Sequence, residues 1–111
     1  MSINPTAMEP YREIMGEEAD AFIADIINTF MVSAPKLVAD MERNISRNEK
    51  QTFIRNAHTL KSNSGTVGAS KLSELAAILE EAGSRSDLPT LAGKLREAKA
   101  ELKLVIAFFR R

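Results

Sequence analysis

Apolar residues recur at intervals of three and four along almost the whole chain, and no segment alternates as a strand would. This pattern predicts five helices and no sheet: residues 7–15, 18–46, 48–64 and 69–82, and a last helix that opens at Ser86 or Asp87. The longest one contains Pro35, which has no amide donor and crowds the carbonyl of Met31. We therefore expect a kink at Pro35 or a break into two helices. The apolar stripe continues beyond it through Leu37, Val38, Met41 and Ile45.

Residues with special backbone preferences predict where these helices begin and end. Gly16 and Gly83 are expected to stop the first and fourth helices, because glycine accepts the left-handed conformation that closes a helix. Asn48 is the expected N-cap of the third helix, with Gln51 as its capping-box partner. Gly65 and Gly68 are expected to form the turn that follows it.

Each predicted helix has one apolar face, and the connections between the helices are short. Short connections make sequence neighbours antiparallel, so the expected fold is all-α: an up-down four-helix bundle with a short extra N-terminal helix. The 111 residues are enough for a single domain over 1–111 and too few for two. Because the chain buries its own apolar stripes, we expect a monomer.

The composition narrows the function. Fifteen Lys and Arg balance fifteen Asp and Glu, so no overall positive field predicts a nucleic-acid or membrane partner. No cysteine is present, which excludes disulfides and thiolate chemistry. Residues 1–10 do not resemble a signal peptide, and we expect no membrane span and a cytoplasmic location. Asp20 and Asp25 differ too much in helical phase to cooperate, and no glycine-rich nucleotide loop is present, so neither a metal, a cofactor nor ATP-dependent kinase activity is expected.

The one side chain that predicts chemistry is His58, the single histidine. It follows Ala57 of the inner stripe and therefore lies about 100° around the helix, at the edge of the apolar face. A lone helical histidine is most often structural or solvated. Here, however, helix geometry gathers an ammonium, a guanidinium, a hydroxyl and small residues around it, a surface suited to an anion and to an approaching protein: Gln51, Arg55, Lys61, Ser62 and Gly65.

The segment from Ala57 to Gly68 resembles the signature of the histidine-containing phosphotransfer (HPt) family. That signature has a phosphorylated histidine, a lysine three residues later, small residues in the next turn, and two following glycines. The matching positions here are His58, Lys61, Ser62, Gly65 and Gly68. The resemblance extends to the Phe30-to-Pro35 and Leu72-to-Glu80 segments. Many members have glycine directly after the lysine, whereas this chain has Ser62, which is small enough for function to survive.

This resemblance implies a phosphorelay intermediate that accepts and donates a phosphoryl group at His58. Its partners would be receiver domains, of a hybrid histidine kinase or of a response regulator, that carry the aspartate and the Mg²⁺ site. Lys61 would favour the phosphorylated state, and Glu80 would orient the imidazole. The resemblance also implies a partner-binding surface of apolar residues, to which the small and basic residues near the histidine would contribute: Tyr11, Ile14, Met15, Phe22 and Ile26, with Arg55, Ser62 and Gly65.

Three other interpretations are compatible with parts of the pattern. The chain could be the phosphoaccepting domain of a chemotaxis-type kinase, which takes phosphate from an ATP-binding domain in trans. It could be a helical adaptor that docks on receivers without transferring phosphate, although an adaptor has no need of a nucleophilic histidine. It could also be an unrelated structural bundle.

Overall fold

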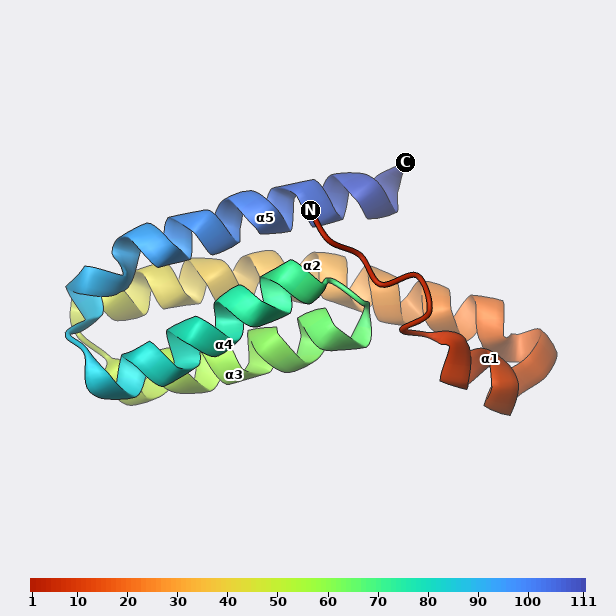
Figure 1. Ribbon diagram of the computed structural model, residues 1–111, viewed down its shortest axis with the longest axis horizontal. Coiled ribbons are helices and arrows are strands. Elements are labelled where there is room, and N and C mark those ends of the chain that lie inside the picture. The colour runs from red at the N-terminus through yellow and green to blue at the C-terminus, as the bar shows by residue number, and fades with distance from the viewer.

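The computed structural model describes all 111 residues and contains four long helices and three short helical segments. Figure 1 shows the long helices side by side, with the short helix α1 at one end. No strand is present; one isolated antiparallel bridge joins Ile3 to Ala69. The elements in chain order are α1 (Glu9–Met15), η1 (Gly16–Glu18), α2 (Ala19–Arg47), α3 (Lys50–Thr66), α4 (Ser70–Arg85), η2 (Leu88–Leu91) and α5 (Ala92–Arg110).

The four long helices form the expected antiparallel up-down bundle. The chain runs away from the α1 end in α2, returns in α3, and repeats the excursion in α4 and α5 (Figure 1). Each long helix packs against two others, so α2, α3, α4 and α5 form a closed ring. The core between them is aliphatic with two phenylalanines, Phe30 and Phe53, which agrees with the scarcity of aromatic residues.

Helix α2 passes through Pro35 without a break, so the alternative of two separate helices is wrong. Pro35 is exposed on the surface of α2, and the helix continues through it although its nitrogen has no hydrogen to donate. The core stripe continues on both sides of it, since Ala34, Val38 and Met41 are buried.

Three of the predicted boundary residues have other roles in the structure. Asn48 ends α2 instead of beginning α3: its left-handed backbone (φ 53°) makes it the C-cap of α2, and α3 starts without a side-chain cap. Gly83 does not stop α4, which continues to Arg85. Gly65 lies inside α3, and only Gly68, at φ 79°, belongs to the turn. Gly16 does end α1, with φ 58°.

The N-terminal residues 1–6, here called the N-terminal strap, lie across the turn between α3 and α4. The Asn4 amide donates to the Gly68 carbonyl at 2.7 Å, and the Ser70 amide donates to the Ser2 carbonyl at 3.1 Å. The strap then leads into α1, which packs on the start of α2 (Figure 1).

One stretch within Glu9–Arg47 is long and apolar enough to cross a membrane by length and composition alone. The expectation that no stretch would reach this length was therefore wrong. Only 22% of that window is buried, although Phe30, Ala34, Val38 and Met41 of α2 belong to the bundle core.

Gly83 allows α4 to approach α3 closely. A Cβ atom added at Gly83 would lie 3.0 Å from Ile54 Cγ1 and 3.1 Å from Phe53 Cδ1, inside normal contact distance. We predict that Gly83→Val destabilises the bundle by about 1–3 kcal/mol through overpacking, as measured by urea denaturation.

Gly93→Ala is the control, because its Cβ would meet no atom closer than 3.7 Å. That variant should be unchanged or up to about 1 kcal/mol more stable. Equal stability of Gly83→Val and the unmodified protein would contradict the packing argument.

Candidate functional site

His58 lies in the middle of α3, at the boundary between core and solvent. Its neighbours Ala57 and Leu60 are fully buried, whereas the His58 side chain is 58% exposed. The helix therefore presents the ring at the surface while the adjacent turns anchor the backbone in the core. A nucleophile in this position is accessible to another protein.

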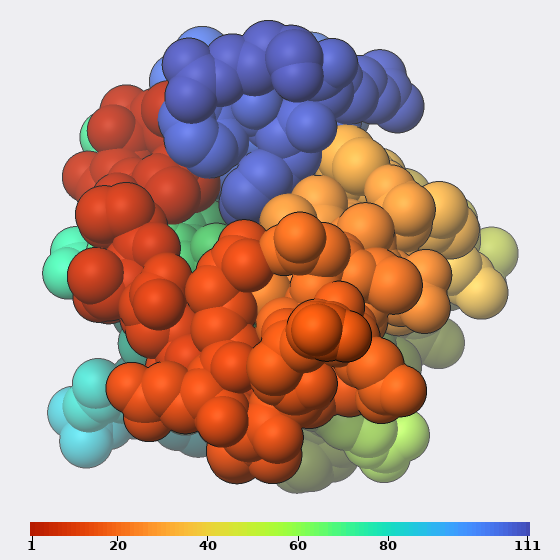
Figure 2. All heavy atoms as spheres, turned by 90° about the vertical axis from the view of Figure 1, so that its right-hand side faces the viewer, coloured from red at the N-terminus to blue at the C-terminus, as the bar shows by residue number.

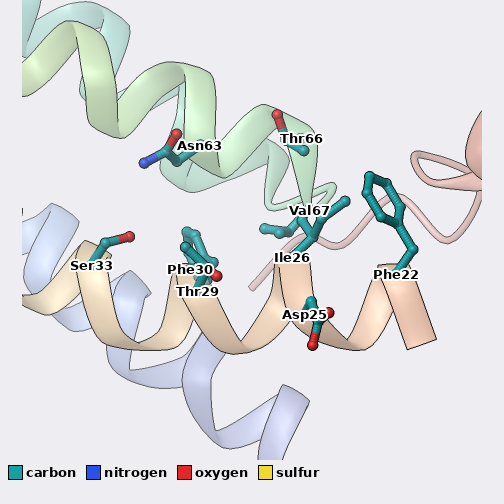
Figure 3. Close-up of a pocket in the computed structure, with 9 residues that line it drawn as sticks. All are labelled: Phe22, Asp25, Ile26, Thr29, Phe30, Ser33, Asn63, Thr66 and Val67. Carbon is teal, nitrogen blue, oxygen red and sulfur yellow. The ribbon is translucent and has the colours of Figure 1, made fainter. Parts of the chain in front are cut away.

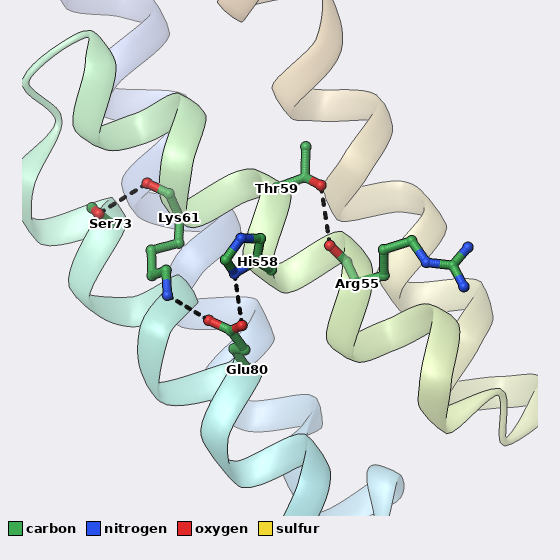
Figure 4. Close-up of polar contacts among 6 residues, drawn as sticks. All are labelled: Arg55, His58, Thr59, Lys61, Ser73 and Glu80. Atoms are coloured by element: carbon green, nitrogen blue, oxygen red, sulfur yellow. Dashed lines mark hydrogen bonds and ion pairs between the residues drawn. The ribbon is translucent and has the colours of Figure 1, made fainter.

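A carboxylate from the neighbouring helix contacts the ring. Glu80 of α4 places Oε2 2.8 Å from His58 Nδ1 and Oε1 2.7 Å from Lys61 Nζ, so one carboxylate bridges both side chains (Figure 4). Glu80 lies within hydrogen-bond reach of the ring, as the orienting role requires; the role itself stays a prediction. Lys61 contacts Glu80 directly, so its charge is already paired before any phosphoryl group is present.

This contact decides which ring nitrogen is available for chemistry. An ionised carboxylate only accepts hydrogen bonds, so His58 Nδ1 must carry the proton that it shares with Glu80. In the neutral imidazole the other nitrogen, Nε2, then has the free electron pair. The arrangement thus prepares Nε2 as a nucleophile and fixes the plane of the ring.

The Glu80 carboxylate remains ionised over a wide pH range. The hydrogen bond from Lys61 lowers the pKa of Glu80 below its usual 4.5, partial burial opposes this shift, and the hydrogen bond from His58 reinforces it. The negative charge that faces the ring is therefore present at every pH at which an imidazole is neutral.

Side-chain contacts to backbone carbonyls fix the surrounding helix. Ser73 Oγ of α4 donates to the Lys61 carbonyl at 3.0 Å, and Thr59 Oγ1 donates to the Arg55 carbonyl at 3.1 Å (Figure 4). The Arg55 guanidinium is exposed and has no ion-pair partner, so it leaves an uncompensated positive charge one turn from His58.

Small residues continue the surface along α3. Ser62 and Gly65 are both exposed, one and two turns beyond His58. A Cβ at Gly65 would meet only Ser73 Oγ, at an ordinary 3.6 Å. Internal packing therefore does not require a glycine there, although glycine weakens a helix interior. An open backbone suits the close approach of a partner.

A groove of about 290 Å³ runs between α2 and the end of α3 (Figure 3). Its walls combine apolar and polar side chains, among them a buried Ser33 hydroxyl that has no hydrogen-bond partner. The lining residues are Phe22, Asp25, Ile26, Thr29, Phe30, Ser33, Asn63, Thr66 and Val67. The groove thus contains Phe22 and Ile26, two of the predicted partner-binding residues.

The other three apolar residues of the predicted partner-binding set lie on α1, at the end of the molecule that Figure 2 faces. Ile14 is 83% exposed, which is unusual for a large apolar side chain. Tyr11 is half-buried and packs on the Phe22 ring, with the centroids 5.3 Å apart, and Met15 is half-buried. The tilted rings of Tyr11 and Phe22 connect α1 to the groove.

Sequence reasoning missed several residues of this region. The contact between Ser73 and Lys61 joins two helices, so the sequence pattern within either helix does not indicate it. The polar groove residues Thr29 and Ser33 did leave a signal, since they lie at helical spacing beside the apolar stripe of α2.

Comparisons with known proteins agree with this geometry. A model of the Hpt domain family matches residues 25–107, most of the chain. The crystal structure of histidine-containing phosphotransfer protein B (HptB) from Pseudomonas aeruginosa PAO1 superimposes with a TM-score of 0.83 at 19% sequence identity. That match covers 97% of this chain and 90% of the other and establishes the fold. A search of curated protein sequences gave no match.

The chain therefore belongs to the Hpt domain family and is a phosphotransfer protein of two-component signalling. The predicted family and the all-α bundle are confirmed.

The bridging carboxylate should make the stability of the bundle depend on pH. Because the folded-state pKa of Glu80 is lowered, its stabilising contribution is present above pH 4.5 and is lost as the pH falls through the lowered value. We predict that Glu80→Ala is less stable than the unmodified protein at pH 7, and that the difference shrinks below pH 4.5. Urea denaturation of both proteins across this range measures it. The control is Glu81→Ala, whose exposed carboxylate pairs only with Arg85. A pH-independent difference for Glu80→Ala would contradict the assignment.

Proposed function

We propose that the protein is a phosphorelay intermediate that accepts and donates a phosphoryl group at His58, exchanging it with the aspartates of receiver domains. The observation that carries the proposal is the hydrogen bond between His58 Nδ1 and Glu80 Oε2, which leaves Nε2 free on an exposed ring. A purely structural histidine would not need a free nitrogen that faces solvent.

The reaction that fits this geometry is a direct transfer between two side chains. The Nε2 electron pair of His58 attacks the phosphorus of an aspartyl phosphate as the phosphorus–oxygen bond to the aspartate breaks, and the aspartate leaves as a carboxylate. The ring keeps its Nδ1 proton and becomes positively charged, and the ionised Glu80 stabilises this charge. The reverse steps return the phosphoryl group to an aspartate.

Lys61 and Glu80 are proposed to act by position and charge, without taking up a proton. Lys61 holds Glu80 through the 2.7 Å contact, and Glu80 in turn holds the ring. The Lys61 ammonium also keeps a positive charge one turn from His58, where it favours the phosphorylated state.

The receiver would supply the remaining catalytic groups. The receiver would bring its own aspartate and Mg²⁺ site, as the resemblance to the family implies. We propose that the protein acts in the cytoplasm as a monomeric phosphocarrier without ATP-dependent kinase activity. We further propose that it docks through the α1 and α2 surface together with Arg55, Ser62 and Gly65.

A second candidate function is that of a phosphoaccepting domain served in trans by a chemotaxis-type kinase. The contact between His58 and Glu80 favours it equally, because the resemblance gives that class the same histidine–glutamate pair. Offering the protein two donors, a phosphorylated receiver and such a kinase domain with ATP, distinguishes the two functions.

His58→Gln should abolish phosphorylation. The variant keeps a polar side chain at an exposed position, so the fold should be retained, as circular dichroism can verify. Incubation with radiolabelled phospho-receivers from the same genome should transfer acid-labile label to the unmodified protein and none to the variant. Undiminished labelling of His58→Gln would refute the proposed site.

Ile14→Ala should weaken docking without affecting the fold. Since Ile14 is 83% exposed, its truncation should change stability by less than about 0.5 kcal/mol. If the side chain enters the receiver interface, the KM for the phosphorylated receiver should rise by roughly fivefold, corresponding to about 1 kcal/mol. Tyr11→Ala should act in the same direction but with some loss of stability, because Tyr11 packs on Phe22.

The matched control for Ile14→Ala is Leu104→Ala. Leu104 is also a large exposed apolar residue, but it belongs to α5, which lies across the ring from α3. A KM that rises equally in the two variants would place docking elsewhere.

A further inference from the structure

Glu101 of α5 is a buried carboxylate that the phosphotransfer site does not use. Its side chain is only 3% exposed. Its polar contacts all come from the N-terminal strap: the Ser2 amide donates to Oε2 at 3.3 Å, and the Met1 amino group lies 3.7 Å from Oε1. Burial of a carboxylate is costly unless donors compensate it. The strap supplies those donors.

The strap is also bound to the turn between α3 and α4. The hydrogen bonds from Asn4 to Gly68 and from Ser70 to Ser2 flank the Ile3–Ala69 bridge, so the strap pairs with this turn like a short strand. Gly68 leaves no room for a side chain, since an added Cβ would lie 2.5 Å from the Asn4 carbonyl oxygen and 2.9 Å from Ala7 Cβ. The strap is thus fitted between α5 and the end of α3.

The strap leads directly into α1 and so contributes to its position. Its residues lead within a few positions into α1, whose seven residues contain no buried side chain and no side-chain cap. A helix this short is not stable alone in water. It is held on the start of α2 by Tyr11 packing on Phe22, by the 2.6 Å ion pair between Arg12 and Asp20, and by the strap behind it.

We propose that Glu101 is a positioning residue for receiver docking: by holding the strap, it helps to fix α1, with the half-buried Tyr11 and the exposed Ile14, near the groove. The inference rests on the proposed function, because it assigns α1 to the receiver interface. Glu101 acts at a distance from the reacting atoms and affects how well a receiver binds, not the chemistry at His58. The strap is bound to Glu101 and to the turn at Gly68 through main-chain groups, and Ile3 also packs against the bundle core.

Glu101→Met tests the proposal. Methionine fills a similar volume, and replacement of a buried charge by an apolar side chain is often neutral for stability. We expect the amides of Asn4 and Tyr11 to exchange faster with deuterium while those of the bundle core do not. We expect the KM for a phosphorylated receiver to rise by about three- to tenfold with kcat unchanged. The rate at which phosphoramidate, a small phosphoryl donor, labels His58 should also remain unchanged.

Two variants control this result. Glu101→Gln keeps an acceptor oxygen for the Ser2 amide and should restore much of the KM and of the exchange protection. Glu97→Gln removes an exposed carboxylate of the same helix that contacts only Lys94 and should have no effect. If the strap amides of Glu101→Met exchange at an unchanged rate, Glu101 does not hold the strap. That outcome would refute the proposal at any value of the KM for the receiver. Faster exchange with an unchanged KM would refute the positioning role.

A crosslink provides a rescue experiment. Ile3 and Ala69 lie opposite each other, between the hydrogen bond from Asn4 to Gly68 and the one from Ser70 to Ser2. In antiparallel pairs of this kind the two Cα atoms are closer than in pairs that bond to each other. That spacing suits a disulfide, and the chain has no other cysteine. Adding Ile3→Cys and Ala69→Cys to Glu101→Met should return the KM to normal once oxidation is verified by mass. An oxidised protein with a persistently high KM would overturn the proposal. Failure of the unmodified protein to accept phosphate from any receiver would instead refute the proposed function.

Discussion

The register in which α3 packs against α4 is the constraint on which the site depends. Near one end of the contact Gly83 lets α4 approach Phe53 and Ile54, and nearer the other end Ser73 donates to the Lys61 carbonyl. Glu80 lies between these two fixed points along α4. Its carboxylate is therefore placed where it reaches both His58 and Lys61, and a shift by one residue would turn it about 100° around the helix and away from both.

The charges of the site balance one another, so the site lowers the stability of the fold little. One carboxylate is shared by an ammonium and an imidazole at the edge of the core, where water still reaches part of each group. The arrangement avoids the penalty of a fully buried ion pair. It also leaves His58 Nε2 on the exposed side of the ring while Nδ1 is bound to Glu80. In the proposed reaction, the carboxylate that compensates the positive charge of the phosphorylated ring is already in place.

The two ends of the molecule differ in how their apolar surface is used. Within the bundle, apolar side chains from α2 to α5 form one core of buried residues. At the α1 end, Ile14 and Phe22 remain exposed and the groove between α2 and α3 is open. Exposure of large apolar residues near an open groove is typical of a surface that a partner covers. The N-terminal strap belongs to this end, although its anchor, Glu101, is buried against α5.

The sequence by itself determined the helices, the all-α class and the position of His58, because helical periodicity is a local property that each segment carries in its own residues. It also located Lys61 and Glu80 through the resemblance to a family. Local rules failed at Asn48, Gly65 and Gly83, where the same residue type can end a helix, begin one or fill a tight contact between helices. Only packing decides among these uses. The bridging contact of Glu80, the groove, and the strap on Glu101 join residues far apart in the chain, so the tertiary structure alone could decide them.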